Sequence, residues 1–187
     1  MAQPLGMGKW WVALLAAATG VILTGVQTVE RITLLNDPSA GLVCDVNEVL
    51  SCSQVLDAWQ SSVVLGIPNA FIGGAIFAVL GSAALSSILG STLSRAFLLA
   101  IWALALFFGV FATWYMLQTG FVIGALCLWC IGNTTAVGLI GAVLTHAVAK
   151  AGHLGAWAST AADAGLDVMV WLGWWLALAA LVAIALI

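Results

Sequence analysis

Four long stretches of the sequence contain no Lys, Arg, Asp or Glu, and they constrain the fold more than any other feature. They comprise residues 10–29, 58–94, 96–149 and 168–187. A straight helix over the longest stretch would extend about 80 Å, whereas the hydrocarbon core of a bilayer is roughly 30 Å thick. With 64% hydrophobic and 6% charged residues, the chain differs from soluble domains, in which roughly a quarter of residues are charged. We interpret it as an integral membrane protein.

Five membrane-spanning helices are expected within a single domain, residues 1–187. Charged residues mark the ends of the spans, because an ionised side chain at the bilayer centre costs several kcal/mol. The polar residues 118–120 divide the longest stretch in two. The expected helices cover about 10–29, 67–89, 96–117, 122–148 and 168–187. The first has no clear cleavage site of small residues, so we interpret it as a retained helix and not as a signal peptide.

The basic residues predict how the helices are oriented. Alternation of five spans places Lys9, Arg95 and Lys150 on one side and Arg31 on the other. The positive-inside rule makes the first side cytoplasmic. The polar loop at about 30–62, which contains six of the eleven charged residues, then lies outside the cytoplasm together with all four cysteines.

The remaining polar residues suggest little further chemistry. Only four Lys or Arg occur and they are not clustered, which excludes a basic nucleic-acid surface and a polybasic lipid anchor. We expect the acidic residues of the loop, including Glu30, to be solvated, and we assign no role to His146 and His153. The last helix opens with three expected interfacial anchors, Trp171, Trp174 and Trp175.

The cysteines form two pairs that could exchange electrons. Cys127 and Cys130 are three residues apart and would share a helix face, so they can form a disulfide. A helix N-terminus stabilises a thiolate, as thiol exchange requires. Cys44 and Cys52 lie in the polar loop on the same predicted side, where an oxidising exterior permits disulfides. Two pairs at different depths indicate a thiol relay.

Two alternatives are open for these cysteines. Two inert disulfides would make the protein a structural or transport protein, but a Cys-x-x-Cys bridge closes a small loop and constrains the unfolded chain little. A four-cysteine zinc site is possible by count. However, one pair is embedded among apolar residues and not in a turn-rich knuckle, so we predict no metal.

Three motifs resemble the vitamin K epoxide reductase family. Residues 43–55, which begin Val-Cys-Asp-Val and contain Ser-Cys-Ser, resemble the loop signature of that family, with seven residues between the cysteines. Residues 66–73 resemble the start of its second helix, and Cys-Leu-Trp-Cys at 127–130 resembles its quinone-side redox motif. The resemblance covers about residues 10–148, and the fifth helix resembles bacterial members. It implies a bundle of four transmembrane helices around a quinone site, with a fifth helix alongside.

The resemblance also implies an activity and a location. Electrons would pass from a reduced thioredoxin-like (DsbA-like) protein on the outer face, through both cysteine pairs, to menaquinone or ubiquinone. Such an enzyme supports disulfide formation in exported proteins from the bacterial cytoplasmic membrane. In this scheme Cys44 exchanges with the partner and Cys52 attacks the inner disulfide at Cys127. Cys130 is then the thiolate that meets the quinone.

The family pattern further implies four quinone-contact residues. Asn69 would donate a hydrogen bond to a quinone carbonyl, although it could instead cap the helix that follows Pro68. Phe71, Trp129 and Thr134 would complete the contacts. Thr134 stands where vertebrate members have a tyrosine, which leaves activity on the epoxide open.

Many bacterial members also continue into a fused thioredoxin-like domain, whereas this sequence stops at Ile187. We therefore expect either that the thioredoxin-like partner is a separate protein or that this sequence is truncated before such a domain.

Overall fold

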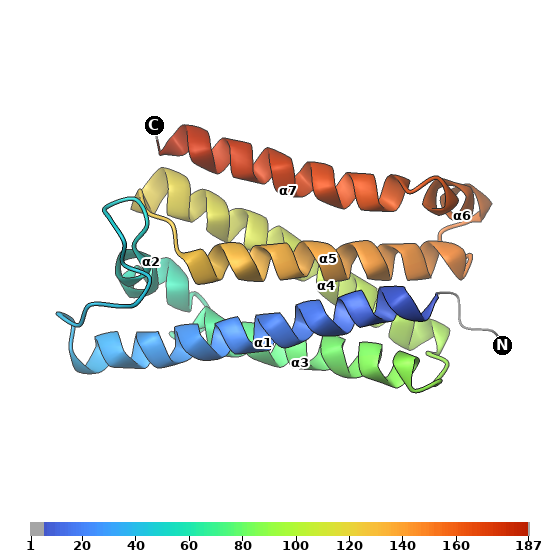
Figure 1. The fold of residues 1–187 in the computed structure, drawn as a ribbon, viewed down its shortest axis with the longest axis horizontal. Coiled ribbons are helices and arrows are strands. Elements are labelled where there is room, and N and C mark those ends of the chain that lie inside the picture. The colour runs from blue at the N-terminus through green and yellow to red at the C-terminus, as the bar shows by residue number, and fades with distance from the viewer. Residues whose placement is uncertain (1–5, 187) are drawn as a thin grey trace.

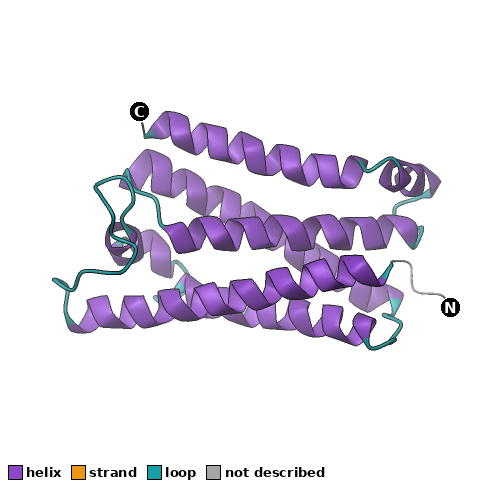
Figure 2. Cartoon of the chain, viewed as in Figure 1, coloured by secondary structure: helices purple, strands orange, loops and turns teal. Residues whose placement is uncertain are grey.

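The structure is a computed structural model that describes residues 6–186. Within that range the chain forms helices joined by short connections (Figure 2). The five long helices are α1 (Met7–Asn36), α3 (Asn69–Ile88), α4 (Arg95–Gln118), α5 (Leu128–Lys150) and α7 (Leu166–Ala185). The shorter elements are α2 (Cys52–Asp57), the 3₁₀ turn η1 (Trp59–Ser62), the π-helical turn η2 (Thr119–Ile123) and α6 (Ala156–Asp163). The predicted end of the last span at Ile187 lies outside the described residues.

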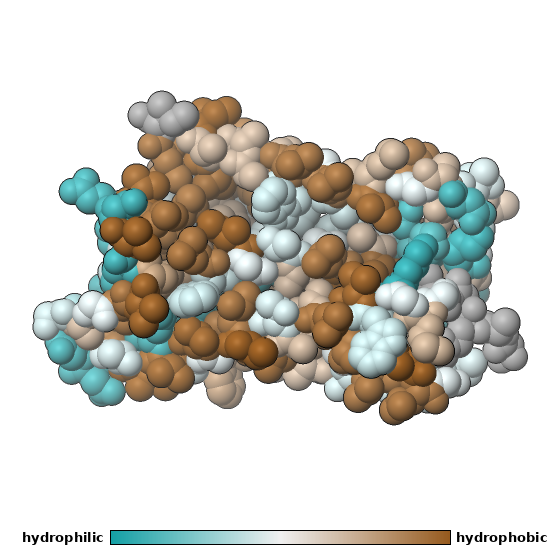
Figure 3. All heavy atoms as spheres, in the orientation of Figure 1, coloured by the Kyte–Doolittle hydropathy of each residue, from teal (hydrophilic) through white to brown (hydrophobic). Residues whose placement is uncertain are grey.

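The long helices form a bundle whose length and composition suit a membrane. Each is long and apolar enough to cross a bilayer, η2 extending the α4 span to Ile123. Apolar side chains cover the middle of the visible face, and hydrophilic ones gather at its two ends (Figure 3). This confirms the expected fold class, an all-α protein with five candidate spans.

The helices lie side by side along one axis (Figure 1). Helix α1 packs on α3 and α5, α4 packs on α5, and α7 contacts both α4 and α5. One end of the bundle carries residues 37–68 and 119–127, and we call it the cysteine end. The other carries Lys9 and the connections 89–94 and 151–165, and we call it the Lys9 end.

Helix α1 extends beyond its predicted end at Val29. It continues to Asn36, and Asp37 leaves the helix with an extended backbone, φ −141° and ψ 96°. Asp37 precedes Pro38, and the residue before a proline is disfavoured in helical conformation. The two charged residues Glu30 and Arg31 therefore belong to the helix and not to the loop.

Helix α5 begins later than the predicted residue 122. The chain leaves η2 through Gly124 in the left-handed region, φ 75°, and reaches Leu126. The Leu126 amide donates to the Val49 carbonyl over 2.7 Å, which holds this segment against the loop. As a result, Cys127 occupies the position just before the helix and Cys130 lies in its first turn.

Helix α7 is fastened to the bundle by its tryptophans. Each indole N–H donates to a threonine hydroxyl on α4 or α5: Trp171 to Thr145 over 3.0 Å, Trp174 to Thr113 over 2.8 Å, and Trp175 to Thr135 over 3.1 Å. Hydrogen bonds between helices stabilise packing in lipid, where apolar burial alone contributes little. The indole N–H groups of these expected interfacial anchors therefore face neighbouring helices, a packing role that the sequence did not predict.

A hydrogen-bonded cluster, in which His146 and Asp167 are buried and Lys9 is exposed, joins three helices at the Lys9 end. His146 Nδ1 lies 2.8 Å from Asp167 Oδ2, and His146 Nε2 lies 2.6 Å from Lys9 Nζ. An ammonium group only donates, so Nε2 accepts and Nδ1 carries the proton that is donated to Asp167. His146, to which the sequence assigned no role, therefore connects α1, α5 and α7.

Candidate redox site

Four sulfur atoms meet at the cysteine end of the bundle. Cys44 and Cys52 form a disulfide, and Cys127 and Cys130 are free thiols. All four side chains are buried. Cys52 Sγ lies 3.1 Å from Cys127 Sγ, so the loop pair and the helix pair meet through these two atoms.

Backbone pairing explains this contact. Leu50 and Leu126 form an isolated parallel bridge, and the Ser51 amide donates to the Leu126 carbonyl over 3.0 Å. In a parallel arrangement the residues that follow on each segment advance in the same direction. Cys52 and Cys127 come soon after the paired residues on their two segments, which brings their side chains together.

Asp45 folds the loop around the first cysteine pair. Its Oδ1 accepts from the Ser53 amide over 2.9 Å and from the Ser51 hydroxyl over 3.1 Å, and its Oδ2 accepts from the Leu42 amide over 3.0 Å. Burial would raise the pKa of Asp45, but these hydrogen bonds outweigh it and lower the pKa below the ordinary value of 3.8. The charged form of Asp45 therefore holds the loop together.

Gln27 on α1 binds the inner thiols and was missed by the sequence analysis. Its Nε2 lies 3.0 Å from Cys130 Sγ and 3.8 Å from Cys127 Sγ, and its Oε1 accepts from Asn133 Nδ2 over 2.7 Å. The signal was present in the sequence: Thr24, Gln27 and Glu30 recur every three residues in an apolar helix, which places them on one face.

Glu30 lies one turn beyond Gln27 on the same face. Only 8% of it is exposed, so the expectation of a solvated loop residue was wrong. Its Oε2 accepts from Trp129 Nε1 over 2.8 Å and lies 3.8 Å from Cys44 Sγ. Its Oε1 is buried with no hydrogen-bond partner among the described residues.

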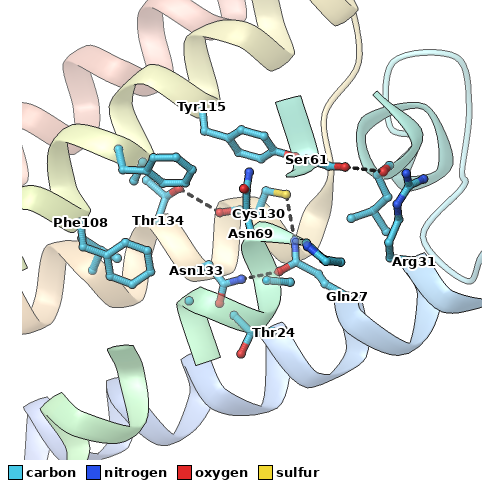
Figure 4. Close-up of a pocket in the computed structure, with 17 residues that line it drawn as sticks. Thr24, Gln27, Arg31, Ser61, Asn69, Phe108, Tyr115, Cys130, Asn133 and Thr134 are labelled. Atoms are coloured by element: carbon cyan, nitrogen blue, oxygen red, sulfur yellow. Dashed lines mark hydrogen bonds between the residues drawn. The ribbon is translucent and has the colours of Figure 1, made fainter. Parts of the chain in front are cut away.

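A cavity opens beside Cys130, and neither cysteine of the loop disulfide lines it. Figure 4 shows Cys130 at its wall, with Gln27 and Asn133 joined by a hydrogen bond. Apolar side chains from α2, α4 and α5 supply much of the lining: Leu56, Phe108, Phe111 and Val137. Polar side chains are interspersed among them: Thr24, Gln27, Arg31, Ser61, Asn69, Tyr115, Asn133 and Thr134.

The structure brings two of the four predicted quinone-contact residues to this cavity. Asn69 lines it, and its amide binds the backbone on both sides of Ser61, another lining residue: Nδ2 donates to the Gln60 carbonyl over 2.6 Å, and Oδ1 accepts from the Val63 amide over 3.2 Å. It does not cap α3. Thr134 also lines the cavity, and its hydroxyl donates to the Cys130 carbonyl over 2.9 Å.

The other two predicted contact residues lie elsewhere. Phe71 is 66% exposed and does not line the cavity. It follows Asn69 by two positions, about 200° around the helix, and so faces the opposite side. Trp129 is also absent from the lining, because its indole points to Glu30.

The only tyrosine of the chain lines the cavity and was not predicted to do so. Tyr115 comes from α4, whereas Thr134 comes from α5. Figure 4 shows its phenol ring beside Cys130. Because the two helices meet only in the folded bundle, no local spacing in the sequence relates this residue to the cysteines.

Comparison with known proteins agrees with this geometry. The sequence matches the VKOR family, the Vitamin K epoxide reductase family, over residues 11–146. No curated protein matches the sequence. The matched region contains all four cysteines and most of the helices that surround the cavity. Members of the family are quinone-linked thiol oxidoreductases that generally act with thioredoxin-like proteins. The chain belongs to the Vitamin K epoxide reductase family.

Proposed function

We propose that this protein oxidises the dithiol of a thioredoxin-like partner and passes the electrons to a quinone, which supports disulfide formation in exported proteins. One observation carries the proposal. Cys52 Sγ lies 3.1 Å from Cys127 Sγ, and the next sulfur, Cys130, lines a cavity whose walls include Phe108 and Phe111. The four sulfurs thus form a continuous path from the loop to the cavity.

The electron path follows from the order of the sulfurs. A partner thiolate would attack Cys44, and the released Cys52 would attack Cys127 of the inner disulfide. Cys130 would then leave as the thiolate. The observed state, with an outer disulfide and an inner dithiol, corresponds to two electrons held on the inner pair. Gln27 Nε2, 3.0 Å from Cys130 Sγ, would stabilise the negative charge.

The cavity residues fit a quinone. Phe108, Phe111 and Val137 would enclose an apolar ring. Asn69 keeps a second amide N–H for a ring carbonyl. Asn133 lines the cavity, and its Oδ1 is buried with no partner among the described residues, so this acceptor suits the hydroxyl of a quinol product. The bound quinone would supply the two-electron acceptor.

The charges favour an orientation in which the cysteine end faces away from the cytoplasm. Lys9, Arg95 and Lys150 lie at the Lys9 end, and Arg31 lies toward the cysteine end, where it pairs with Asp57 over 2.9 Å. The positive-inside rule places the three basic residues in the cytoplasm. The cysteines would then face the oxidising side of a bacterial cytoplasmic membrane.

Replacement of Cys130 tests the function. In a Cys130→Ala variant the protein should insert and fold, but quinone reduction with a reduced thioredoxin-like protein as donor should be abolished. The loss should be complete because no other cysteine lines the described cavity. Absorbance of the quinone measures the rate, and parallel assays with vitamin K epoxide distinguish the two acceptors.

Ser82→Ala is a suitable control, because this exposed serine on α3 lies outside the cavity lining. A Cys130→Ala variant that reduces quinone at the normal rate would refute the relay. Resistance of both cysteine pairs to mild reductant would instead favour a protein with structural disulfides.

A further inference from the structure

Glu30 is the one carboxyl group in contact with the described sulfur cluster. Its Oε2 lies 3.8 Å from Cys44 Sγ, and one of its oxygens and the two sulfurs of the loop disulfide all lie within 4.8 Å of one another. A sulfur that takes part in exchange must lose its proton before it attacks. A carboxylate at this position is within reach of that proton.

The surroundings of Glu30 offer little reason to bury a carboxyl group for stability. Its nearest polar partner is the neutral indole of Trp129, and it forms no ion pair within residues 6–186. The adjacent cation, Arg31, pairs with Asp57 instead. Since a buried charge is normally paired, an unpaired one marks a candidate functional group.

The titratable groups around Glu30 come from three elements. The loop contributes Cys44 and Asp45, α2 contributes Cys52, and α5 contributes the inner thiols, of which Cys130 interacts electrostatically with Glu30. The Asp45 carboxylate is committed to the Leu42 and Ser53 amides. This leaves Glu30 as the acceptor beside Cys44.

We propose that Glu30 accepts the proton of the Cys44 thiol when Cys44 re-forms the outer disulfide. The inference rests on the proposed function, because it assigns a proton acceptor to one step of the relay. That step begins from a mixed disulfide between Cys52 and Cys127. The Cys44 proton moves to Glu30, the Cys44 sulfur attacks Cys52 Sγ, and the Cys44–Cys52 bond forms.

The atoms and electrons balance in this step. The Cys52–Cys127 bond breaks, and its electron pair leaves on Cys127 as a thiolate. Cys44 is oxidised, and the inner pair is left fully reduced. The proton held by Glu30 returns to Cys44 when a partner dithiol next reduces the outer disulfide and releases Cys44 as a thiolate. Glu30 is therefore regenerated in each cycle.

Glu30→Gln tests the proposal because glutamine keeps the shape and an acceptor for Trp129 but cannot take up a proton. Purified protein with both pairs oxidised is mixed with dithiothreitol, quenched in acid, alkylated and analysed by mass spectrometry. The Cys52–Cys127 mixed disulfide should persist about a hundredfold longer in the variant at neutral pH. The difference between the variant and the wild type should shrink as the pH rises toward the ordinary thiol pKa of about 8.5, because the thiol then loses its proton to the solvent.

Two further variants complete the experiment. Glu48→Gln makes the same change at an exposed carboxyl in the loop that carries Cys44, and it should match the wild type. Glu30→Asp retains an acid, so it should recover part of the rate and keep a pH dependence. This variant also tests the proposal if Glu30→Gln fails to fold.

The outcomes separate this inference from the proposed function. If the wild type never forms the Cys52–Cys127 disulfide, the relay itself is wrong. If it does, but Glu30→Gln shows the same lifetime at every pH, Glu30 is not the proton acceptor. A lifetime lengthened by one constant factor at every pH would also overturn the proposal, because it would indicate that Glu30 only positions Trp129.

Discussion

Two carboxyl groups are buried at opposite ends of the bundle, and their partners differ. At the Lys9 end, Asp167 Oδ2 lies 2.8 Å from His146, which contacts the ammonium group of Lys9. At the cysteine end, Glu30 Oε2 lies 2.8 Å from the neutral indole of Trp129. Each group has a second oxygen that is buried without a hydrogen-bond partner among the described residues.

The difference separates a structural carboxylate from a reactive one. The negative charge of Asp167 is balanced through His146 by Lys9, and the three residues join α1, α5 and α7. Glu30 has no such cation but lies against a sulfur. We therefore expect changes at Asp167 to act on stability and changes at Glu30 to act on the rate of thiol exchange.

The largest stability effect is expected at Asp167. Asp167→Ala leaves the buried His146 N–H without its acceptor and removes a charge that is paired across three helices. The free energy of unfolding should fall by about 3 kcal/mol. Denaturant-induced unfolding in detergent measures the loss, and turnover per folded molecule should stay near the wild-type value.

Asp163→Ala provides the matched control. Asp163 also pairs with a basic residue near the Lys9 end, but its side chain is 64% exposed. Exposed ion pairs contribute little, so this variant should unfold like the wild type. If Asp167→Ala slowed thiol exchange as strongly as Glu30→Gln does, the division between a structural and a reactive carboxylate would fail.

The same comparison shows what the sequence could predict. The uncharged stretches indicated five spans correctly, because hydropathy decides which segments can enter a membrane. They misplaced the end of the first helix, because a charged residue such as Glu30 can face a neighbouring helix as well as water. The cysteine pairs were found because each is a local motif. The spacing of Thr24, Gln27 and Glu30 marks a polar face on the first helix, but no local pattern relates Gln27 or Tyr115 to Cys130. Both residues approach Cys130 from helices that meet it only after folding.

A smaller loss of stability is expected where α7 packs on the bundle. A Cβ atom on Gly141 would collide with the Trp171 ring, whose indole is held by Thr145. Gly141→Ala should therefore lower the free energy of unfolding by about 2 kcal/mol, as overpacking does. Gly173→Ala on α7 meets nothing within 4 Å and should show no loss. Equal losses for both would mean that Trp171 does not fix α7.

The smallest and most local effect is expected for the loop around Cys44. The pKa of Asp45 in the folded protein is lower than its ordinary value of 3.8. Its charged form therefore stabilises the loop fully at pH values above 3.8, and this stabilisation is lost as the pH falls through the pKa of the folded state. Hydrogen exchange at the Leu42 and Ser53 amides, corrected for intrinsic rates, should show a loss of protection in that acidic range. In Asp45→Asn the side chain cannot accept hydrogen bonds from both amides and from Ser51 as the carboxylate does. Protection of the two amides should therefore weaken by about 1 kcal/mol at neutral pH. The loss of protection at acidic pH should disappear, because asparagine does not titrate.

Asp37 also has a lowered pKa, because it accepts from the hydroxyl and amide of Ser39. The Ser39 amide should therefore also lose protection from hydrogen exchange at acidic pH, and this loss should persist in Asp45→Asn. A loss of protection at acidic pH that remained at Leu42 in that variant would show that another group closes the loop. The charge of Asp45 would then not be what stabilises the loop. The backbone pairing of residues 49–51 with Leu126 would be the remaining candidate.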